Sequence, residues 1–152
     1  ILRLLQEDGR MTNAALADAV GLTATPMLQR IRKLEQQGVI RRYMAVVDPE
    51  KLGRSVLAFV HVTLRTHGIA IHKKFLDRVE TFEEVLECHH IAGEEDFLLK
   101  VAVRNIRQLE TFLLHRLSTS DLIGRVKTTL ILSSSKSMGA IPTSEEQEEP
   151  SQ

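Results

Sequence analysis

A segment near the N-terminus constrains the fold most, because its apolar spacing and its glycines favour two short helices joined by a tight turn. The first helix is predicted to begin after Thr12, a residue that caps helix N-termini well. It is predicted to end at Gly21, because glycine tolerates a left-handed backbone. The second is predicted to begin after a cap at Thr23 and to stop at Gly38. Two short helices arranged in this way are typical of a helix-turn-helix that binds DNA, here expected to be winged-helix-like.

The second helix has an apolar side and a polar side. At about 100° per residue, an apolar stripe faces the core and a polar face with several cations lies opposite it. Such side chains can donate to phosphates and to purine edges, although a solvated amphipathic helix is the simpler interpretation. The combination of helices, turn and caps favours DNA binding. The residues predicted to contact double-stranded DNA are Thr23, Thr25, Gln29, Arg30, Arg32, Lys33 and Gln36.

Charge is distributed unevenly along a chain whose formal net charge is zero. Residues 1–54 carry nine Lys and Arg against six Asp and Glu, and residues 55–152 carry eleven against fourteen. A basic N-terminal module joined to an acidic one fits a DNA-binding head and a body that stays off DNA.

The composition also indicates in which cellular compartment the protein functions. No run of 18 apolar residues occurs, so a membrane span is not expected. Cys88 is the single cysteine, which excludes an internal disulfide and suits a reducing cytoplasm. No basic-then-apolar leader is seen, and the sequence opens inside an apolar helical pattern, so we expect a cytoplasmic protein with a truncated first helix.

Beyond the head, residues 1–42, the pattern predicts three further regions. Residues 43–54 should form a strand-like connector that ends in a helical turn at Gly53. Residues 55–135 alternate as strand 56–64, helix 69–79, strands 85–91 and 97–103, helix 106–117 and strand 126–132. That order, βαββαβ, predicts a ferredoxin-like domain, so the whole chain is of the α+β class. Residues 136–152 are rich in Ser and Glu and are expected to be a disordered acidic tail, or to pack on a neighbouring subunit.

The predicted sheet is apolar on both faces. Val56, Ala58 and Val60 alternate with Leu57 and Phe59 along the first strand. Helices cover only one face of such a sheet, so the other face is expected to pack against a second copy of the domain.

Other chemical signatures are weak. Cys88 and His90 share one side of a strand and His89 lies on the other, which makes a poor metal site, so no metal or other cofactor is expected. The remaining histidines, including His67 and His72, are scattered along the sequence. No phosphate loop, nucleophile elbow or paired-carboxylate motif occurs, so the chain is not expected to be an enzyme.

Two stretches make the chain resemble the Lrp/AsnC family of prokaryotic leucine-responsive and asparagine-responsive regulators. The first, DGRMTNAALADAVGLTATPMLQRIRKLEQQGVI, carries the family's Arg30, its Leu-Glu pair and its Gly-Val-Ile run. The second, ECHHIAGEEDFLLKVAVRN, carries the family's Gly-x-x-Asp turn as Gly93 to Asp96. The resemblance covers the chain to about Lys136.

The resemblance implies a transcription regulator whose body dimerises, assembles further into octamers and binds a small effector, commonly an amino acid, between bodies near the Gly-x-x-Asp turn. Carried over by position, the candidate effector residues are His90, Ala92, Gly93, Glu94, Glu95, Asp96, Ile106, Thr129, Leu130 and Ile131. Two alternatives stay open. One is an effector-binding body whose head does not read DNA. The other is an enzyme similar to sirohaem decarboxylases, with His89, His90 and Arg104 in the active site.

The turn has a chemistry of its own that fits a zwitterion. Free N–H groups at Gly93 suit a carboxylate, and Asp96 can accept from an ammonium group. We further expect a positive φ at Gly93, which a β-branched residue would resist. An ordinary hairpin with solvating acids explains the same residues.

Overall fold

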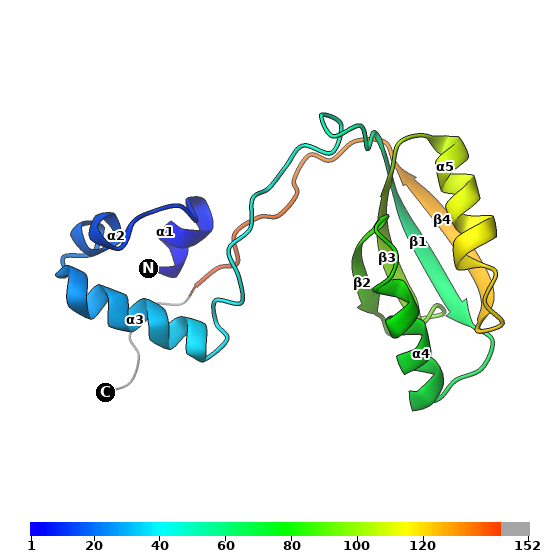
Figure 1. Ribbon diagram of the computed structural model, residues 1–152, viewed down its shortest axis with the longest axis horizontal. Helices are drawn as coiled ribbons and strands as arrows, with labels where there is room; N and C mark the ends of the chain where they lie inside the picture. The colour runs from blue at the N-terminus through cyan, green and yellow to red at the C-terminus, as the bar shows by residue number, and fades with distance from the viewer. Residues whose placement is uncertain (144–152) are drawn as a thin grey trace. The chain divides into compact units, whose positions relative to one another are not determined.

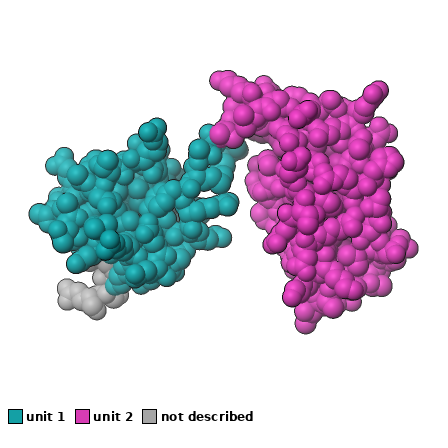
Figure 2. Space-filling model, viewed as in Figure 1, with its two compact units in different colours: residues 1–46, 136–152 teal, residues 47–135 magenta. Residues whose placement is uncertain are grey.

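The computed structural model describes residues 1–143, and the chain folds into two compact units. We call the first the head, which comprises residues 1–46 and the chain from residue 136 onward, and the second the body, residues 47–135. Figure 2 shows the two units in different colours. The boundary lies inside the predicted connector. No helix in the described part of the chain is long and apolar enough to cross a membrane.

The head is a bundle of three helices. They are α1 (Leu2–Glu7), α2 (Asn13–Ala19) and α3 (Ala24–Gln36) (Figure 1). Thr12 caps α2 as predicted, because its side chain accepts a hydrogen bond from the Ala15 N–H. Gly21 and Gly38 both have a φ of 71°, the left-handed conformation that follows a helix end. Thr23 is the N-cap of α3 by position, but its side chain makes no capping hydrogen bond, so that prediction is wrong in detail.

All three helices contribute to the core of the head. Leu16 and Met27 are fully buried, and Ile1, Ala17 and Ile31 nearly so. Leu22, in the turn between α2 and α3, is partly buried against this cluster. Among the described residues of the head no strand is assigned, so the helix-turn-helix has no β-sheet wing there.

The body has the predicted βαββαβ order. Its elements are β1 (Val56–Leu64), α4 (Ile69–Val79), β2 (Val85–His90), β3 (Phe97–Val103), α5 (Ile106–Thr111), the π-helical segment η1 (Phe112–Leu117) and β4 (Ile123–Ile131). The four strands form one antiparallel sheet in the order β2-β3-β1-β4. The helices lie on one face of this sheet (Figure 1).

The register of β1 fixes which residues face the helices. Val60 pairs with Leu99 on one side, and both are fully buried together with Phe75 of α4 and Phe112 of η1. The alternation of buried and half-buried residues along β1 is the predicted one. In α4 the sequence spacing predicts an apolar stripe of Ile71, Phe75, Leu76 and Val79. Leu76 is 41% exposed, so its place in that stripe is wrong.

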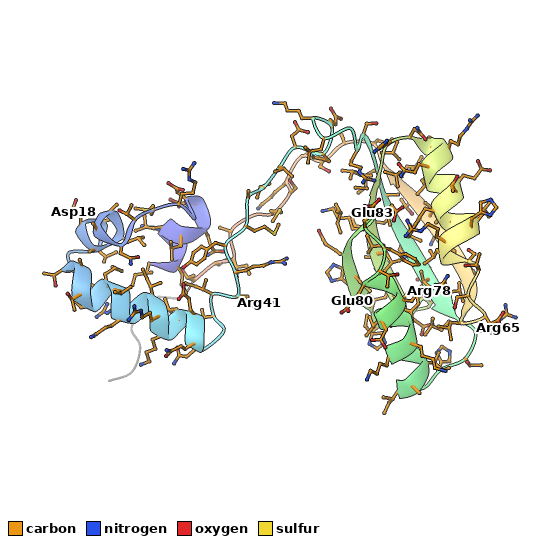
Figure 3. All side chains as sticks on the ribbon, in the orientation of Figure 1. Asp18, Arg41, Arg65, Arg78, Glu80 and Glu83 are labelled. Carbon is orange, nitrogen blue, oxygen red and sulfur yellow. The ribbon has the colours of Figure 1, made fainter. Side chains whose placement is uncertain are left out.

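Two body elements differ from the predicted ones. The helix predicted over 106–117 continues as a π-helix after Thr111, where polar contacts hold the last turn. Arg78 on α4 (Figure 3) donates to the carbonyl oxygen of Arg116 at 2.6 Å, and Arg116 pairs with the buried Glu84. β4 begins at Ile123, three residues before the predicted start, because the segment pairs with the end of β1.

The connector and the tail also differ from the sequence prediction. Residues 41–48 have no assigned strand, and a single turn then closes at Gly53 as predicted. The prediction of a disordered tail is wrong at Ile141. Its backbone N–H donates to Gln6 Oε1 at 2.7 Å and its carbonyl accepts from Gln6 Nε2 at 3.1 Å, although its side chain is exposed. The acidic residues from 144 onward lie outside the described residues.

Candidate functional site

The outer face of α3 carries the residues predicted to contact DNA. Thr23, at the N-cap, and Thr25, Gln29, Arg32 and Gln36, in the helix, are exposed. Arg30 and Lys33 lie at the flanks and are half-buried. Met27 and Ile31 fix the orientation of this face, because they are buried on the opposite side of the helix. The structure therefore brings all seven residues onto the outer side and start of one helix.

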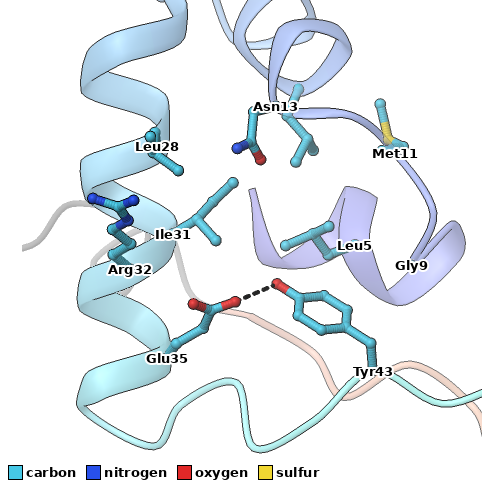
Figure 4. A pocket seen from close by; sticks show the side chains of 10 residues that line it. Leu5, Gly9, Met11, Asn13, Leu28, Ile31, Arg32, Glu35 and Tyr43 are labelled. Atoms are coloured by element: carbon cyan, nitrogen blue, oxygen red, sulfur yellow. Dashed lines mark hydrogen bonds between the residues drawn. The ribbon is translucent and has the colours of Figure 1, made fainter.

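A tyrosine that the sequence analysis did not single out links the connector to α3. The Tyr43 hydroxyl donates to Glu35 Oε1 at 3.1 Å (Figure 4). Burial, the hydrogen bond to Glu35 and the charge of Glu35 together raise the pKa of Tyr43 above its ordinary value. Arg32 lies about one helical turn before Glu35. Arg32, Glu35 and Tyr43 all line a pocket of about 290 Å³ in the head. Tyr43 had no sequence signal beyond being an aromatic residue in a strand-like run.

The candidate effector residues fall into two groups in a single chain. His90 and residues 92–96 form the hairpin between β2 and β3, which the hydrogen bond from Ile91 N to Asp96 O closes. Ile106 follows the far end of β3, beyond Val103, which lies about 20 Å along the strand from Phe97. Residues 129–131 pair with residues 57–59 of β1, whereas the hairpin lies beside Val62. One chain therefore does not bring Ile106 and residues 129–131 to the turn.

The turn itself is exposed over Ala92, Gly93 and Glu94. Gly93 does not have a positive φ, and a Cβ atom there would meet nothing within 4 Å. The expectation that a β-branched residue would be strained at this position is therefore wrong. Glu95 Oε1 lies 3.6 Å from Lys127 Nζ, and this ion pair ties the turn to β4.

Asp96 has a structural role that the sequence did not reveal. Its Oδ2 accepts from the backbone N–H of Leu64 at 2.7 Å, and its side chain is 17% exposed. Its other oxygen, Oδ1, lies 3.3 Å from His67 Nδ1. The carboxylate therefore joins the end of β1 to the hairpin, and only part of its accepting capacity is left for a ligand.

The histidines are less scattered than the sequence suggested. A donor atom from each of His67, His72 and Asp96 lies within 4.8 Å of the other two. The His72 ring also packs edge-on against His90, with ring centroids 4.9 Å apart. Cys88 points to the helix face, where desolvation raises its pKa, and His89 lies on the other face within 3.1 Å of Glu87. The triplet Cys88-His89-His90 is thus split between the two faces as expected.

The open face of the sheet is the second candidate surface of the body. Leu57, Phe59, Leu98 and Ile131 lie on it and are half-buried, and no helix among the described residues covers them. Lys100 and Glu87 form an ion pair of 2.9 Å on the same face. The hydrogen bonds from Lys100 and His89 lower the pKa of Glu87 below its ordinary value.

An exposed recognition helix on a three-helix head, joined to a ferredoxin-like sheet domain, defines a DNA-binding regulator with a sensing or assembly domain. Comparison with known proteins agrees with this class. Residues 1–41 match a winged helix-turn-helix DNA-binding family, and residues 57–141 match the Lrp/AsnC ligand binding domain. The chain belongs to the Lrp/AsnC family of transcription regulators.

Individual relatives carry the same assignment. The leucine-responsive regulatory protein of Rhizobium meliloti is 39% identical over 132 residues, which cover 87% of this chain and 85% of that protein. The protein of the same name from Escherichia coli is 44% identical over 103 residues, which cover 68% of this chain and 63% of that protein, so the match spans less than two thirds of its length. A transcriptional regulator from Neisseria meningitidis, solved in complex with L-methionine, superposes with a TM-score of 0.87 at 30% identity, covering 93% of this chain and 91% of that chain. These relatives are regulators, and nothing among them supports the decarboxylase alternative.

Proposed function

We propose that the outer face of α3 reads the DNA sequence, with Gln29 contacting a base edge and Arg32 and Lys33 contacting phosphates. The observation that carries this proposal is the common exposure of Thr25, Gln29, Arg32 and Gln36 along a helix whose other side is buried. Glutamine can pair with adenine through two hydrogen bonds, whereas long cations reach the backbone readily.

The test begins by mapping the genomic binding sites of the full chain, followed by measurement of affinity for single-base variants of one site. Gln29→Ala should reduce discrimination at one base pair by roughly 1–3 kcal/mol and leave the other positions unchanged. Gln37→Ala, an exposed glutamine at the end of the same helix, is the matched control. Discrimination that survives Gln29→Ala at every position would remove Gln29 from base reading.

We propose that the body binds an amino acid at the hairpin of residues 90–96, with a second subunit completing the site. The exposure of Ala92, Gly93 and Glu94, the last of them an acid, supports this location. The separation of Ile106 and residues 129–131 from the hairpin within one chain supports the need for a partner. The relative from Neisseria meningitidis binds L-methionine, which makes methionine and leucine the first compounds to test.

A calorimetric titration with both amino acids tests this site. Glu94→Gln should weaken binding, because Glu94 is the exposed acid of the turn that no described ion pair engages. Glu80→Gln, an exposed acid at the end of α4, should bind as the unchanged chain does. If Glu94→Gln binds normally while a variant at His90 does not, the ammonium group is held elsewhere in the hairpin.

We propose that the open face of the sheet forms the dimer and that dimers assemble further, to the octamers that the family resemblance implies. Four half-buried apolar side chains on an uncovered face support a partner of the same shape, since a second sheet would bury them. We expect the chain to act in the cytoplasm, where a regulator of this kind binds its DNA. Sedimentation of the full chain at several concentrations would measure the assembly.

A further inference from the structure

Three elements of the body converge on a cluster of metal-binding side chains. His67 comes from the loop after β1, His72 from the first turns of α4, and Asp96 from the end of the hairpin before β3. We propose that His67, His72 and Asp96 bind a divalent cation of the zinc class.

The distances suit such an ion. One donor atom from each residue lies within 4.8 Å of the others, and the pair His67 Nδ1 and Asp96 Oδ1 is separated by 3.3 Å. Two donors bound tetrahedrally to zinc lie about 3.4 Å apart, given bonds of about 2.0–2.1 Å. The His67 side chain is 67% exposed and has room to adjust toward the other two donors.

The donor set selects the class of metal. Two imidazoles and one carboxylate suit Zn²⁺, Co²⁺ or Ni²⁺ and disfavour Mg²⁺ and Ca²⁺, which take oxygen ligands. Three protein ligands leave a fourth position for water or a small molecule. The first turn of α4 carries a partial positive charge that opposes a cation, and the carboxylate of Asp96 offsets it.

Burial and hydrogen bonding support a ligand here. Nε2 of His72 is buried and has no hydrogen-bond partner among the described residues, a situation that a bound ion or a shift of the ring would relieve. Asp96 is held by the Leu64 N–H, which orients its carboxylate as a supporting hydrogen bond does in metal sites. The His90 and Phe97 rings pack against His72 and limit its rotation.

The site would act on the proposed effector hairpin. A cation held by all three side chains joins the loop at His67, helix α4 and the hairpin at Asp96, so it should stiffen the turn that begins at Ala92. Asp96 belongs both to the hairpin of residues 90–96 and to the proposed metal site, whereas Ala92, Gly93 and Glu94 supply none of the three donors. Metal binding can therefore be tested in the absence of an amino acid.

The experiment is a zinc titration of the full chain after EDTA treatment and removal of any histidine tag, followed by calorimetry and by thermal unfolding. We expect one ion per chain and a raised melting temperature. His67→Ala and His72→Gln should each weaken binding at least tenfold and abolish the thermal shift. His115→Ala and His89→Ala, which change exposed histidines elsewhere in the body, are the controls.

Co²⁺ provides a second readout. Nitrogen and oxygen ligands should give the visible absorption of tetrahedral cobalt without a thiolate charge-transfer band. Such a band would place Cys88 on the metal and overturn the proposed ligand set. The proposal also fails if His67→Ala binds zinc as tightly as the unchanged chain. His67 lies on an exposed loop, so this variant is expected to fold even if His72→Gln does not.

Discussion

In the head, the seven residues predicted to contact DNA come from one helix and its N-cap, whereas in the body each candidate site draws on several elements. Helical periodicity of about 3.6 residues places Gln29, Arg32 and Gln36 on one face as soon as the buried face is known. The cluster of His67, His72 and Asp96 depends instead on how a loop, a helix and a hairpin meet. A surface on one element can be inferred locally, and a site between elements cannot.

The largest expected effect is that a substitution in the core of one unit destabilises that unit and leaves the stability of the other unchanged. Phe75 is fully buried in the body, so Phe75→Ala should destabilise the body by roughly 3–5 kcal/mol. Tyr43 is the single tyrosine, the chain has no tryptophan, and Tyr43 lies in the head, so intrinsic fluorescence reports on the head alone. In urea, Phe75→Ala should shift the circular dichroism transition and leave the tyrosine transition in place.

Met27→Ala is the matched change in the core of the head, where Met27 is fully buried. It should lower the free energy of unfolding of the head by about 2–5 kcal/mol, and so shift the tyrosine fluorescence transition instead. Both probes moving together in both variants would show that the two units unfold as one.

A charge on the open face of the sheet should weaken the dimer. Phe59 pairs with Lys100 on one side and Thr129 on the other, so Phe59→Glu can be accommodated in a single subunit. Loss of a central aromatic anchor costs at least about 2 kcal/mol at an interface, which raises the dimer dissociation constant roughly 30-fold. Sedimentation velocity measures this, with the exposed Lys74→Gln on α4 as the control. A dimer that survives Phe59→Glu must use another face.

Asp96→Ala should destabilise the body, because it leaves the Leu64 N–H without its acceptor. A lost charge-assisted hydrogen bond to a part-buried group costs roughly 1–3 kcal/mol. Chemical denaturation of this variant should be compared with that of Asp77→Ala, an exposed acid on α4 that should stay within about 0.5 kcal/mol of the unchanged chain. Equal stability of the two variants would assign Asp96 to ligand binding alone.

The smallest expected effect concerns the link between the connector and α3. The pKa of Tyr43 is raised, so the folded head keeps the phenol proton where the unfolded chain begins to lose it. The stability that this provides is present below the ordinary tyrosine pKa and is lost as pH rises above it. Tyr43→Phe should remove this pH dependence, and the hydrogen bond to Glu35 should contribute about 1 kcal/mol or less, because it is exposed. Tyrosinate absorbance of the unchanged chain, native and in urea, measures the two pKa values directly.

The elements of both units could be predicted from the sequence because each carries a clear period. The alternation along β1 and the bounds of α4 and β3 agree with the structure, since apolar residues there recur at the spacing of a strand or a helix. The connector was predicted as a strand from its β-branched residues, but residues 41–48 have no assigned strand in a single chain. The π-helical turn at Phe112 has no sequence period that separates it from an α-helix.

The candidate sites also differ in how far the sequence could predict them. The exposed face of α3 follows from periodicity, and the hairpin follows from the family's turn. The hydrogen bonds of Asp96 to Leu64 and of Gln6 to Ile141 join residues 32 and 135 positions apart, so no local pattern reports them. The ordinary backbone of Gly93 likewise shows that a glycine in a motif need not have a positive φ.

The salt dependence of DNA binding tests the central claim, that α3 meets the DNA, most directly. Affinity for a mapped genomic site would be measured by fluorescence anisotropy across a salt series, for the full chain with Arg32 and Lys33 both changed to Ala. The control changes Lys73 and Lys74, two exposed cations on α4 of the body, to Ala. If α3 meets the phosphates, the slope of log K against log salt should flatten by about 0.9 for each lost contact, and the control should match the unchanged chain. An unchanged affinity and slope for the Arg32 and Lys33 variant would contradict the placement of this helix on DNA.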